Sequence, residues 1–366
     1  MSYIKYILIV LVIYTSSVFS QNINIGRLDQ LLEYANTGNV EGVKKLIQQG
    51  NITNYINFGD HFGHNALITA SAKGYKDIVL LLLSQNLNLN HTCVHGKTAL
   101  IYAVDNGYID IVSYLLAKNA NPNVKVNNGT TALLQASGKG YYSIVEMLIN
   151  KNADLKIAGL YRDGDNSSYN MTPLMIAAYN NHDLIVELLV NKGADVNRIN
   201  EYGANALFYA IAKGNENIAK ILLKYGADAN IVSSYKQFGN ISTLALASAL
   251  GLNDIVNDLL IGKANINHKS KDGRTALIWA SINSRNDVIE TLIKAKADLN
   301  ITDNEGKTAL MYACENSDYE ATIKLIEAGA NINIRDKYNR NALMYAMESS
   351  NIDLINYITK SALMKK

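Results

Sequence analysis

A leucine that returns at a nearly constant interval is the feature that most limits how this chain can fold. The interval is 33 residues in six steps, 41 in one and 37 in another. Self-similarity at such a period predicts a stack of short units, each of which contacts only its neighbours. The nine leucines are Leu67, Leu100, Leu133, Leu174, Leu207, Leu244, Leu277, Leu310 and Leu343.

The unit at 268–300 shows the local pattern most regularly. Gly273 suits a turn because glycine tolerates positive φ, and Thr275 is a typical helix-capping residue. Apolar residues then recur at helical spacing in two short segments, which predicts two short helices. Neither helix is long enough to be stable alone in water, so stacking has to supply the missing burial.

Three motifs carry a resemblance to a known family. They are the Thr-Pro-Leu segment Thr172–Ala178, the Ile-Val-x-Leu-Leu-like segment Asp183–Val190, and the Gly-Ala-Asp-x-Asn exit Gly193–Asn197. The chain resembles ankyrin-repeat proteins on these motifs, which recur in phase from about residue 28 to residue 366. The resemblance implies an all-α repeat solenoid of helix-turn-helix units with projecting β-hairpin turns.

The expected domain is one ankyrin-repeat array over 21–366. Two units are lengthened in the turn before the first helix, by eight residues between Ile157 and Asn170 and by four between Val232 and Ile241. Insertions of this kind collect on one face of an array, and both partner binding and neutral drift are open explanations. The expected units are 28–57, 58–90, 91–123, 124–156, 157–197, 198–230, 231–267, 268–300, 301–333 and 334–366.

Residues 1–20 read as a signal peptide. Lys5 precedes an apolar run over 6–14, and Val18 and Ser20 are small or apolar residues at the −3 and −1 places of a cleavage site before Gln21. The apolar run is shorter than the roughly 20 residues that span a bilayer. We therefore expect an exported protein, periplasmic or secreted, without a stable membrane span after cleavage.

Composition does not support a nucleic-acid or lipid-surface role driven by bulk charge. The chain has 34 basic and 32 acidic residues and a formal net charge of +2, which does not favour nucleic acid. Cys93 and Cys314 lie six repeats apart, on the order of 60 Å at about 10 Å per helical layer. A disulfide between them is excluded in a continuous array. We also expect the protein to be a monomer.

The sequence predicts no catalytic, cofactor or metal residues. Gly96 and Gly306 precede Lys-Thr but lack the first glycine of a phosphate loop, and the Asp163 loop lacks the glycine and glutamate of a calcium loop. Asp110, Asp183 and Asp287 read as caps of second helices. The aromatic residues Tyr102, Tyr209, Trp279, Tyr312 and Tyr345 share one place in the first helix, where packing with the polar tip at the rim explains them.

The function implied by the resemblance is protein binding through turn tips and the inner surface of the first helices. The residues at those places differ between units, whereas the leucines and alanines do not. One alternative is a secreted effector or host-contact protein, and another is a metal-binding or enzymatic protein that uses His61, His64, His91, Cys93 and His95. The turn candidates are Phe62, His64, His95, Lys97, Asn127, Tyr202, Arg274, Glu305 and Tyr338, and the inner-helix candidates are Lys73, Asp105, Lys139, Tyr179, Lys213 and Glu315.

Overall fold

A computed structural model describes residues 24–162, 168–234, 239–349 and 351–364. The expected signal peptide over 1–20 and most of the Asp163 loop lie outside the described residues. The chain divides into two compact units. The first comprises Met1–Ala136 with Ser143–Asp154, and the second comprises Ser137–Tyr142 with Leu155–Lys366. The expectation of a single domain over 21–366 stays a prediction.

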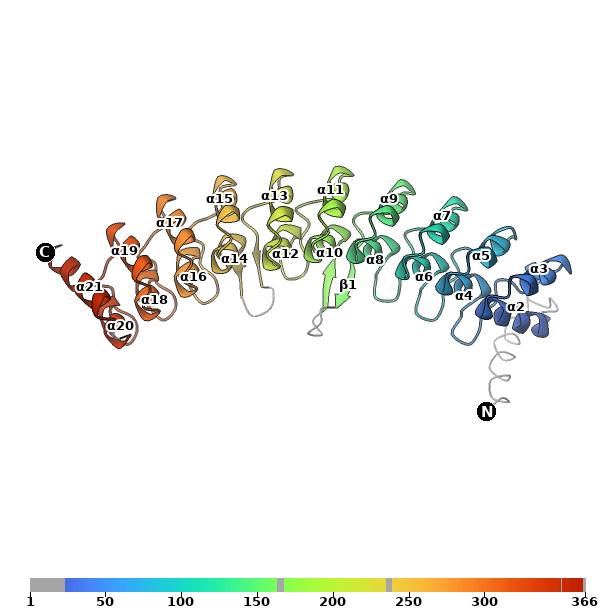
Figure 1. Cartoon of the computed structure of the whole chain (residues 1–366), viewed down its shortest axis with the longest axis horizontal. Coiled ribbons are helices and arrows are strands. Elements are labelled where there is room, and N and C mark those ends of the chain that lie inside the picture. The colour runs from blue at the N-terminus through green and yellow to red at the C-terminus, as the bar shows by residue number, and fades with distance from the viewer. Residues whose placement is uncertain (1–23, 163–167, 235–238, 350, 365–366) are drawn as a thin grey trace, which may run out of the picture. The chain divides into compact units, whose positions relative to one another are not determined.

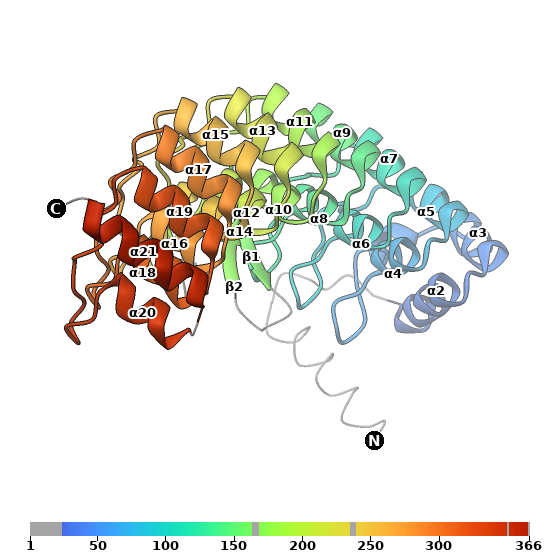
Figure 2. The same cartoon turned by 60° about the vertical axis from the view of Figure 1, so that its left-hand side comes forward.

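Within each unit, first helices pack against first helices and second helices against second helices (Figures 1 and 2). The first helices are α2 Ile25–Thr37, α4 Ala66–Lys73, α6 Ala99–Asp105, α8 Ala132–Lys139, α10 Pro173–Tyr179, α12 Ala206–Ala212, α14 Thr243–Leu250, α16 Ala276–Ile282, α18 Ala309–Glu315 and α20 Ala342–Glu348. The second helices are α3 Val40–Gln48, α5 Lys76–Leu83, α7 Ile109–Ala117, α9 Tyr142–Asn150, α11 Asp183–Asn191, α13 Glu216–Lys224, α15 Asn253–Ile261, α17 Asn286–Lys294, α19 Tyr319–Glu327 and α21 Ile352–Met364. A short 3₁₀ helix, η1, spans Ile52–Asn54.

The two lengthened turns form antiparallel β-hairpins. Strand β1 (Gly159–Arg162) pairs with β2 (Ser168–Met171), with Gly159 opposite Met171, and β3 (Val232–Ser233) pairs with β4 (Ile241–Ser242). Each hairpin directly precedes a first helix. The predicted fold class, an all-α repeat solenoid with hairpin turns, is confirmed.

Side-chain caps begin the first helices, as predicted. The Thr275 hydroxyl accepts a hydrogen bond from the backbone N–H of Ile278 at 3.4 Å, and Thr308 caps α18 in the same way. Asn65 and Asn205 stand in place of threonine before α4 and α12. Each accepts the capping hydrogen bond with its side-chain oxygen, because asparagine caps a helix as well as threonine does.

The prediction that Asp110, Asp183 and Asp287 cap second helices is wrong, although Asp318 does cap α19. The residues at the cap positions before α7, α11 and α17 are Tyr108, His182 and Arg285, and none makes a side-chain cap bond. The aspartates expected there lie one or two positions later, in the first helical turn. At that place a carboxylate interacts favourably with the positive end of the helix dipole instead of capping it.

The recurring leucines form the core between repeats. Eight of the nine are at most 2% exposed, and only Leu343, in the last unit, is partly exposed. Alanines such as Ala70, Ala103 and Ala280 are fully buried beside them, and their small size lets successive first helices approach closely. Cys93 and Cys314 are buried free thiols. Among the described residues, no helix combines the length and the hydropathy needed to cross a membrane.

An asparagine at the exit of most repeats ties each repeat to the following one. In every case its side-chain oxygen accepts a hydrogen bond from a backbone N–H of the following repeat, at 2.7–3.0 Å. At the equivalent place in 124–156 the chain has Lys156, whose side chain has no acceptor oxygen. The asparagines are Asn57, Asn90 and Asn123 in the first unit and Asn197, Asn230, Asn267 and Asn300 in the second.

Replacement of a ladder asparagine should lower stability. Asn300→Ala removes the acceptor of the Asn331 N–H, so we expect a loss of about 1 kcal/mol in the free energy of unfolding. Urea denaturation followed by circular dichroism measures this loss. The matched control is Asn356→Ala, which replaces an exposed asparagine on α21. Equal urea midpoints for the two variants would show that the ladder bond contributes nothing.

Candidate functional site

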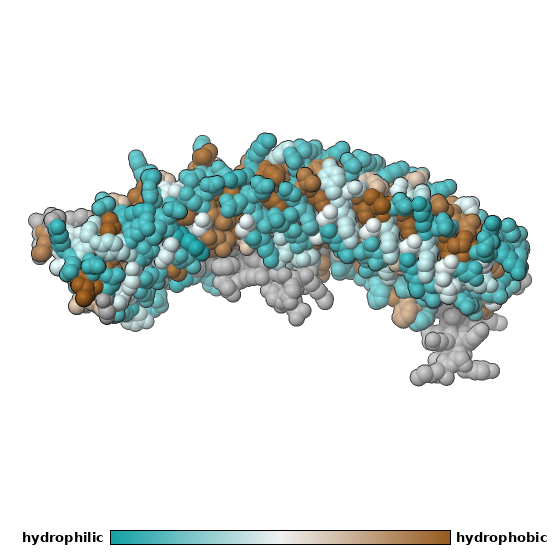
Figure 3. All heavy atoms as spheres, in the orientation of Figure 1, coloured by the Kyte–Doolittle hydropathy of each residue, from teal (hydrophilic) through white to brown (hydrophobic). Residues whose placement is uncertain are grey.

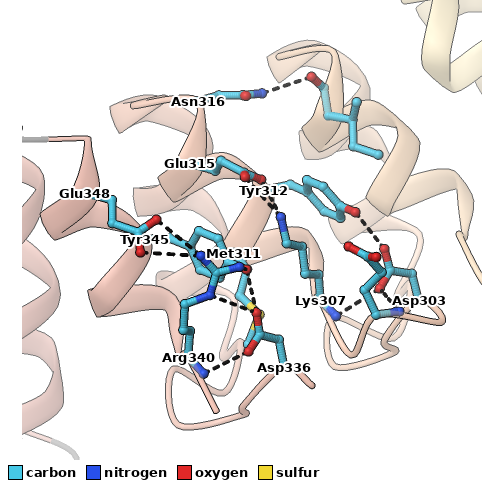
Figure 4. A network of polar contacts seen from close by, with 12 residues as sticks. Asp303, Lys307, Met311, Tyr312, Glu315, Asn316, Asp336, Arg340, Tyr345 and Glu348 are labelled. Carbon is cyan, nitrogen blue, oxygen red and sulfur yellow. Dashed lines mark hydrogen bonds and ion pairs between the residues drawn. The ribbon is translucent and has the colours of Figure 1, made fainter. Parts of the chain in front are cut away.

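A buried aspartate organises the turn of each of the last two repeats. One oxygen of Asp303 accepts hydrogen bonds from the backbone N–H groups of Glu305 and Lys307, both at 2.9 Å. Its other oxygen accepts the hydroxyl hydrogen of Tyr312 at 2.6 Å. Asp336 makes the same three bonds, with Tyr338, Arg340 and Tyr345 as the donors. Figure 4 shows the bonds from Arg340 and Tyr345. The aspartate therefore shapes the turn and fastens it to the first helix that follows.

Related versions of this arrangement occur elsewhere in the chain. Asn200 accepts from Tyr202 N–H and donates to the Tyr209 hydroxyl at 2.7 Å, whereas Cys93 lies 3.7 Å from the Tyr102 hydroxyl. In each pair the tyrosine is nine residues after the turn residue. The prediction that these aromatic side chains are packing residues with a polar tip at the rim needs refinement. Their hydroxyl groups also hold the turns in place.

The tyrosines and Asp336 have pKa values shifted in opposite directions. Burial raises the pKa of Tyr312 and of Tyr345, and the hydrogen bond to the aspartate raises each further. Burial also works against ionisation of Asp336, but the bonds from Tyr345, the backbone and Arg340 outweigh it and lower the pKa of Asp336. At neutral pH Tyr312 and Tyr345 are therefore neutral, and Asp336 is charged.

A cation from each of the last three turns lies against the aromatic side chains of the first helices. The Arg274 guanidinium is 5.0 Å from the Trp279 ring and 5.8 Å from the Tyr312 ring. Lys307 Nζ is 4.9 Å from the Tyr312 ring and 4.6 Å from that of Tyr345. These distances are within the range of cation–π attraction, about 6 Å. Cations and rings thus alternate along this part of the second unit.

The predicted inner-helix residues lie at the ends of the first helices, and two of them pair with turn cations. Lys97 contacts Asp105 at 2.6 Å, so two predicted residues meet directly. Lys307 contacts Glu315 at 2.9 Å, and Lys213 Nζ lies 4.0 Å from the Tyr179 ring. Tyr179 itself is buried. The remaining two, Lys73 and Lys139, are exposed.

The predicted turn residues fall into two groups. His64, Lys97 and Arg274 follow the turn residue by four positions and point to the first helices. His64 reaches the Tyr102 hydroxyl of the next repeat at 3.1 Å, and Arg274 reaches that of Tyr312 at 3.5 Å. The tip residues stand at or near the outermost point of the turn and are mostly exposed. They are Phe62, His95, Asn127, Tyr202, Glu305 and Tyr338.

The tip group contains exposed aromatic side chains. Phe62 is 48% exposed, Tyr202 is 37% exposed and Tyr338 is 61% exposed. Figure 3 shows hydrophilic residues over most of the face displayed, with hydrophobic residues scattered among them. The predicted residues do not converge on one pocket, because they lie in turns and helix ends of many repeats.

Backbone hydrogen bonds join neighbouring turns. Val94 N–H donates to Phe62 O at 2.9 Å, and Lys337 N–H donates to Glu305 O at the same distance. Asn127 also donates its side-chain amide hydrogen to Val94 O at 3.0 Å. The tips are therefore held in fixed register with one another within each of the two units.

The first inserted hairpin is anchored by aromatic contacts. Tyr161 on β1 meets Tyr179 of α10 edge-on, with ring centroids 5.6 Å apart. Tyr169 on β2 packs in the same way against Tyr202 and Tyr209. The hairpin thus widens the turn surface over α10 and α12.

The turn histidines do not gather as a metal site. His91 bonds Gly63 O at 2.9 Å, while His64 and Cys93 both meet the Tyr102 hydroxyl. Among the described residues, no group of three or more histidine, cysteine, aspartate or glutamate side chains is placed to hold a metal ion.

Sequence reasoning missed Asp303, Asp336, Lys307 and Arg340. An available signal was the nine-residue interval between a turn aspartate and a helix tyrosine, which occurs twice in the last two repeats. A second available signal was a cation four positions after the turn residue. Lys307 and Arg340 occupy this position, as Arg274 does in its own repeat.

The comparisons with known proteins agree with this geometry. The family model described as "Ankyrin repeats (3 copies)" matches residues 31–126, 158–233 and 244–336, and the one described as "Ankyrin repeat" matches residues 128–159. Because these matches cover well over half of the chain, it belongs to the ankyrin-repeat family. Ankyrin repeats generally mediate protein–protein interaction, and their fold is typically a non-catalytic scaffold.

A solved structure shows the same fold. The crystal structure of the human ASB11 ankyrin repeat domain is similar with a TM-score of 0.51 and 23% sequence identity. The similarity covers 64% of this chain and 97% of that one. No curated protein sequence matches the chain.

The Asp336 network should contribute stability in a pH-dependent way. Asp336→Asn weakens the bonds to Tyr345 and Arg340, so we expect a loss of about 2 kcal/mol at pH 7. The folded pKa of Asp336 is lowered, so its contribution is present above the unfolded pKa and is lost as the pH falls through the folded value. The wild type and the variant should therefore converge in stability as the pH falls through the lowered folded pKa of Asp336.

Urea midpoints measured from pH 7 downwards test this expectation. Glu187→Gln, at an exposed carboxylate in the middle of α11, is the control and should change stability by less than about 0.5 kcal/mol at any pH. A difference between Asp336→Asn and wild type that does not change with pH would contradict the assignment.

Proposed function

We propose that this chain is an exported ankyrin-repeat protein that binds a protein partner without catalysis. The binding surface consists of the turn tips and the adjoining ends of the first helices. The predicted turn and inner-helix residues, apart from the buried Tyr179, are its contact residues, and the partner binds the whole surface rather than one pocket.

The contrast between constant and variable positions carries this proposal. The place of Leu277 holds leucine in every repeat from 58 onwards, and eight of these leucines are buried. The tip place instead holds phenylalanine, histidine, tyrosine or glutamate at Phe62, His95, Tyr338 and Glu305. Folding does not require exposed aromatic side chains at such places. Tyrosine and arginine are also the residue types that most often dominate the binding energy of protein interfaces.

The order of the turn surface supports the same proposal. Neighbouring turns are joined by backbone hydrogen bonds, and side chains such as Arg274 are held against aromatic rings. A surface that is ordered before binding loses less conformational entropy on association. This property suits a scaffold that recognises a folded or extended partner.

Loss of three surface side chains should abolish partner recovery. We expect the Tyr202→Ala, Arg274→Ala, Tyr338→Ala triple variant to recover at least tenfold less partner from the native envelope fraction, because it removes hot-spot residue types. Quantitative mass spectrometry after affinity purification gives the readout. The matched control replaces exposed side chains on second helices, with Tyr142→Ala, Lys224→Ala and Tyr319→Ala. Unchanged recovery by a folded triple variant would refute the proposed face.

Export has its own test. The composition of residues 1–20 leads us to expect that the mature protein begins at Gln21, which N-terminal sequencing of the native protein determines. Fractionation separates the two expected locations, since protein in the medium favours a secreted effector and protein in the periplasm favours an envelope role. An intact N-terminus at Met1 in a cytoplasmic fraction would contradict export.

A further inference from the structure

Positive charge is concentrated in the turns of three successive repeats in the second unit. We call residues 269–274, 302–307 and 335–340 the basic turns. They contain seven of the 34 basic residues of the chain and four of its 32 acidic residues, a difference of +3. The corresponding turns at 59–64, 92–97 and 125–130 together contain two lysines and one aspartate, a difference of +1.

The acidic residues of the basic turns are largely committed to the turns themselves. The side chains of Asp303 and Asp336 are 1% and 0% exposed, and their oxygens accept bonds from their own turn and from a tyrosine hydroxyl. Only Asp272 and Glu305 present carboxylates to solvent. Lys269, Lys271, Arg335 and Lys337 are exposed, so cations dominate the accessible part of this surface.

Two arginines are held in place and keep part of their hydrogen-bonding capacity. The Arg340 guanidinium donates to Tyr345 and Asp336, whereas its contacts with Glu348 are long, at 3.4 Å (Figure 4). The Arg274 guanidinium is 3.4 Å from Asp272 and 3.8 Å from Asp303; its Nε atom is buried without a hydrogen bond, so the Nη atoms are the donors that remain for a ligand. A guanidinium that rests on aromatic rings and keeps Nη hydrogens not used in short bonds can bind a carboxylate through two N–H donors.

The three basic turns are also in fixed register. Asn304 N–H donates to Asp272 O and Lys337 N–H donates to Glu305 O, both at 2.9 Å. Lys269 Nζ donates to Thr302 O at 2.8 Å across the same junction. The cations therefore recur along a ribbon of bonded turns, where an extended chain with acidic side chains can meet several of them in sequence.

We propose that the basic turns bind an acidic segment of a protein, with Arg274 and Arg340 receiving its carboxylates and Lys271 and Lys337 attracting it. This proposal rests on the proposed function and specifies the chemistry of the partner. A polypeptide fits better than a nucleic acid, because Asp272 and Glu305 stand among the exposed cations and would repel a continuous row of phosphates. The exposed ring of Tyr338, flanked by Lys337 and Arg340, adds an apolar contact that a polypeptide can use.

Binding of a fluorescein-labelled peptide that alternates glutamate and serine tests the proposal directly. Fluorescence anisotropy is measured with the whole chain, and peptides with glutamine or lysine in place of glutamate serve as references. We expect only the glutamate peptide to bind, and its affinity should fall as salt rises from about 0.05 to 0.3 M. Equal binding of the glutamine peptide would overturn the proposal.

Variants locate the site. Lys271→Gln with Lys337→Gln should weaken binding of the glutamate peptide about tenfold, because two exposed cations are lost. Arg274→Lys keeps the charge but loses the fork of N–H donors, and should weaken binding severalfold. The control pair, Lys192→Gln with Lys224→Gln, removes the same charge from exposed ends of second helices and should leave affinity unchanged. An equal loss of affinity in the control pair would show that only the net charge of the chain matters, and would overturn the assignment of the site to the basic turns.

Two further outcomes separate this proposal from the proposed function. A duplex oligonucleotide that binds more tightly than the glutamate peptide at the same salt would assign the basic turns to nucleic acid and overturn the acidic-protein proposal. If no peptide binds while the Tyr202→Ala, Arg274→Ala, Tyr338→Ala variant still loses its partner, the turn surface stands as a protein-binding face and the acidic chemistry is wrong.

Discussion

Burial of leucine and alanine between neighbouring repeats is the interaction on which the rest of this structure depends. Most of the helices have seven to nine residues, a length at which an isolated helix is unstable in water. Each helix pair therefore acquires its stability from the pairs beside it. The asparagine ladder adds a polar connection at most junctions, but it orders repeats that the apolar contacts have already brought together.

This dependence divides the residues of a repeat into two sets. Those that face a neighbouring repeat are constrained to be apolar, small or capping, and they recur. Those at the turn are constrained mainly by backbone geometry, which an aspartate and a glycine such as Gly306, with φ of 81°, can satisfy. Other turn positions are free to vary, and they carry the cations and exposed rings on which we base the proposed binding surface.

Much of the fold could be predicted from sequence because its period is explicit. The position of Leu277 in its repeat, the cap at Thr275 and the placement of both insertions in hairpins all follow from local rules. The Asp303–Tyr312 and Asp336–Tyr345 hydrogen bonds could not be predicted from local rules, because each joins a turn to a residue of the next helix, nine positions later. The expected aspartate caps were wrong for a related reason, since a shift of one or two residues separates a cap from the first helical turn.

The candidate site was predictable as a set of places but not as a network. Tip residues such as Phe62 and Tyr338 are exposed, in keeping with their variable places. Lys97 and Asp105, in contrast, were selected separately and turn out to pair with each other, which only three-dimensional proximity shows. Residues that pair internally serve a partner chiefly by being held in position, and the exposed tips make the first contact.

The central claim is that variable turn residues bind a protein partner while the repeated residues hold the stack. Hydrogen–deuterium exchange of the chain, alone and with its copurified partner, tests this claim most directly. The account predicts new protection in the turns, including 269–274, 302–307 and 335–340, with little change in the second helices α11, α13, α15 and α17. Protection confined to those second helices would contradict it.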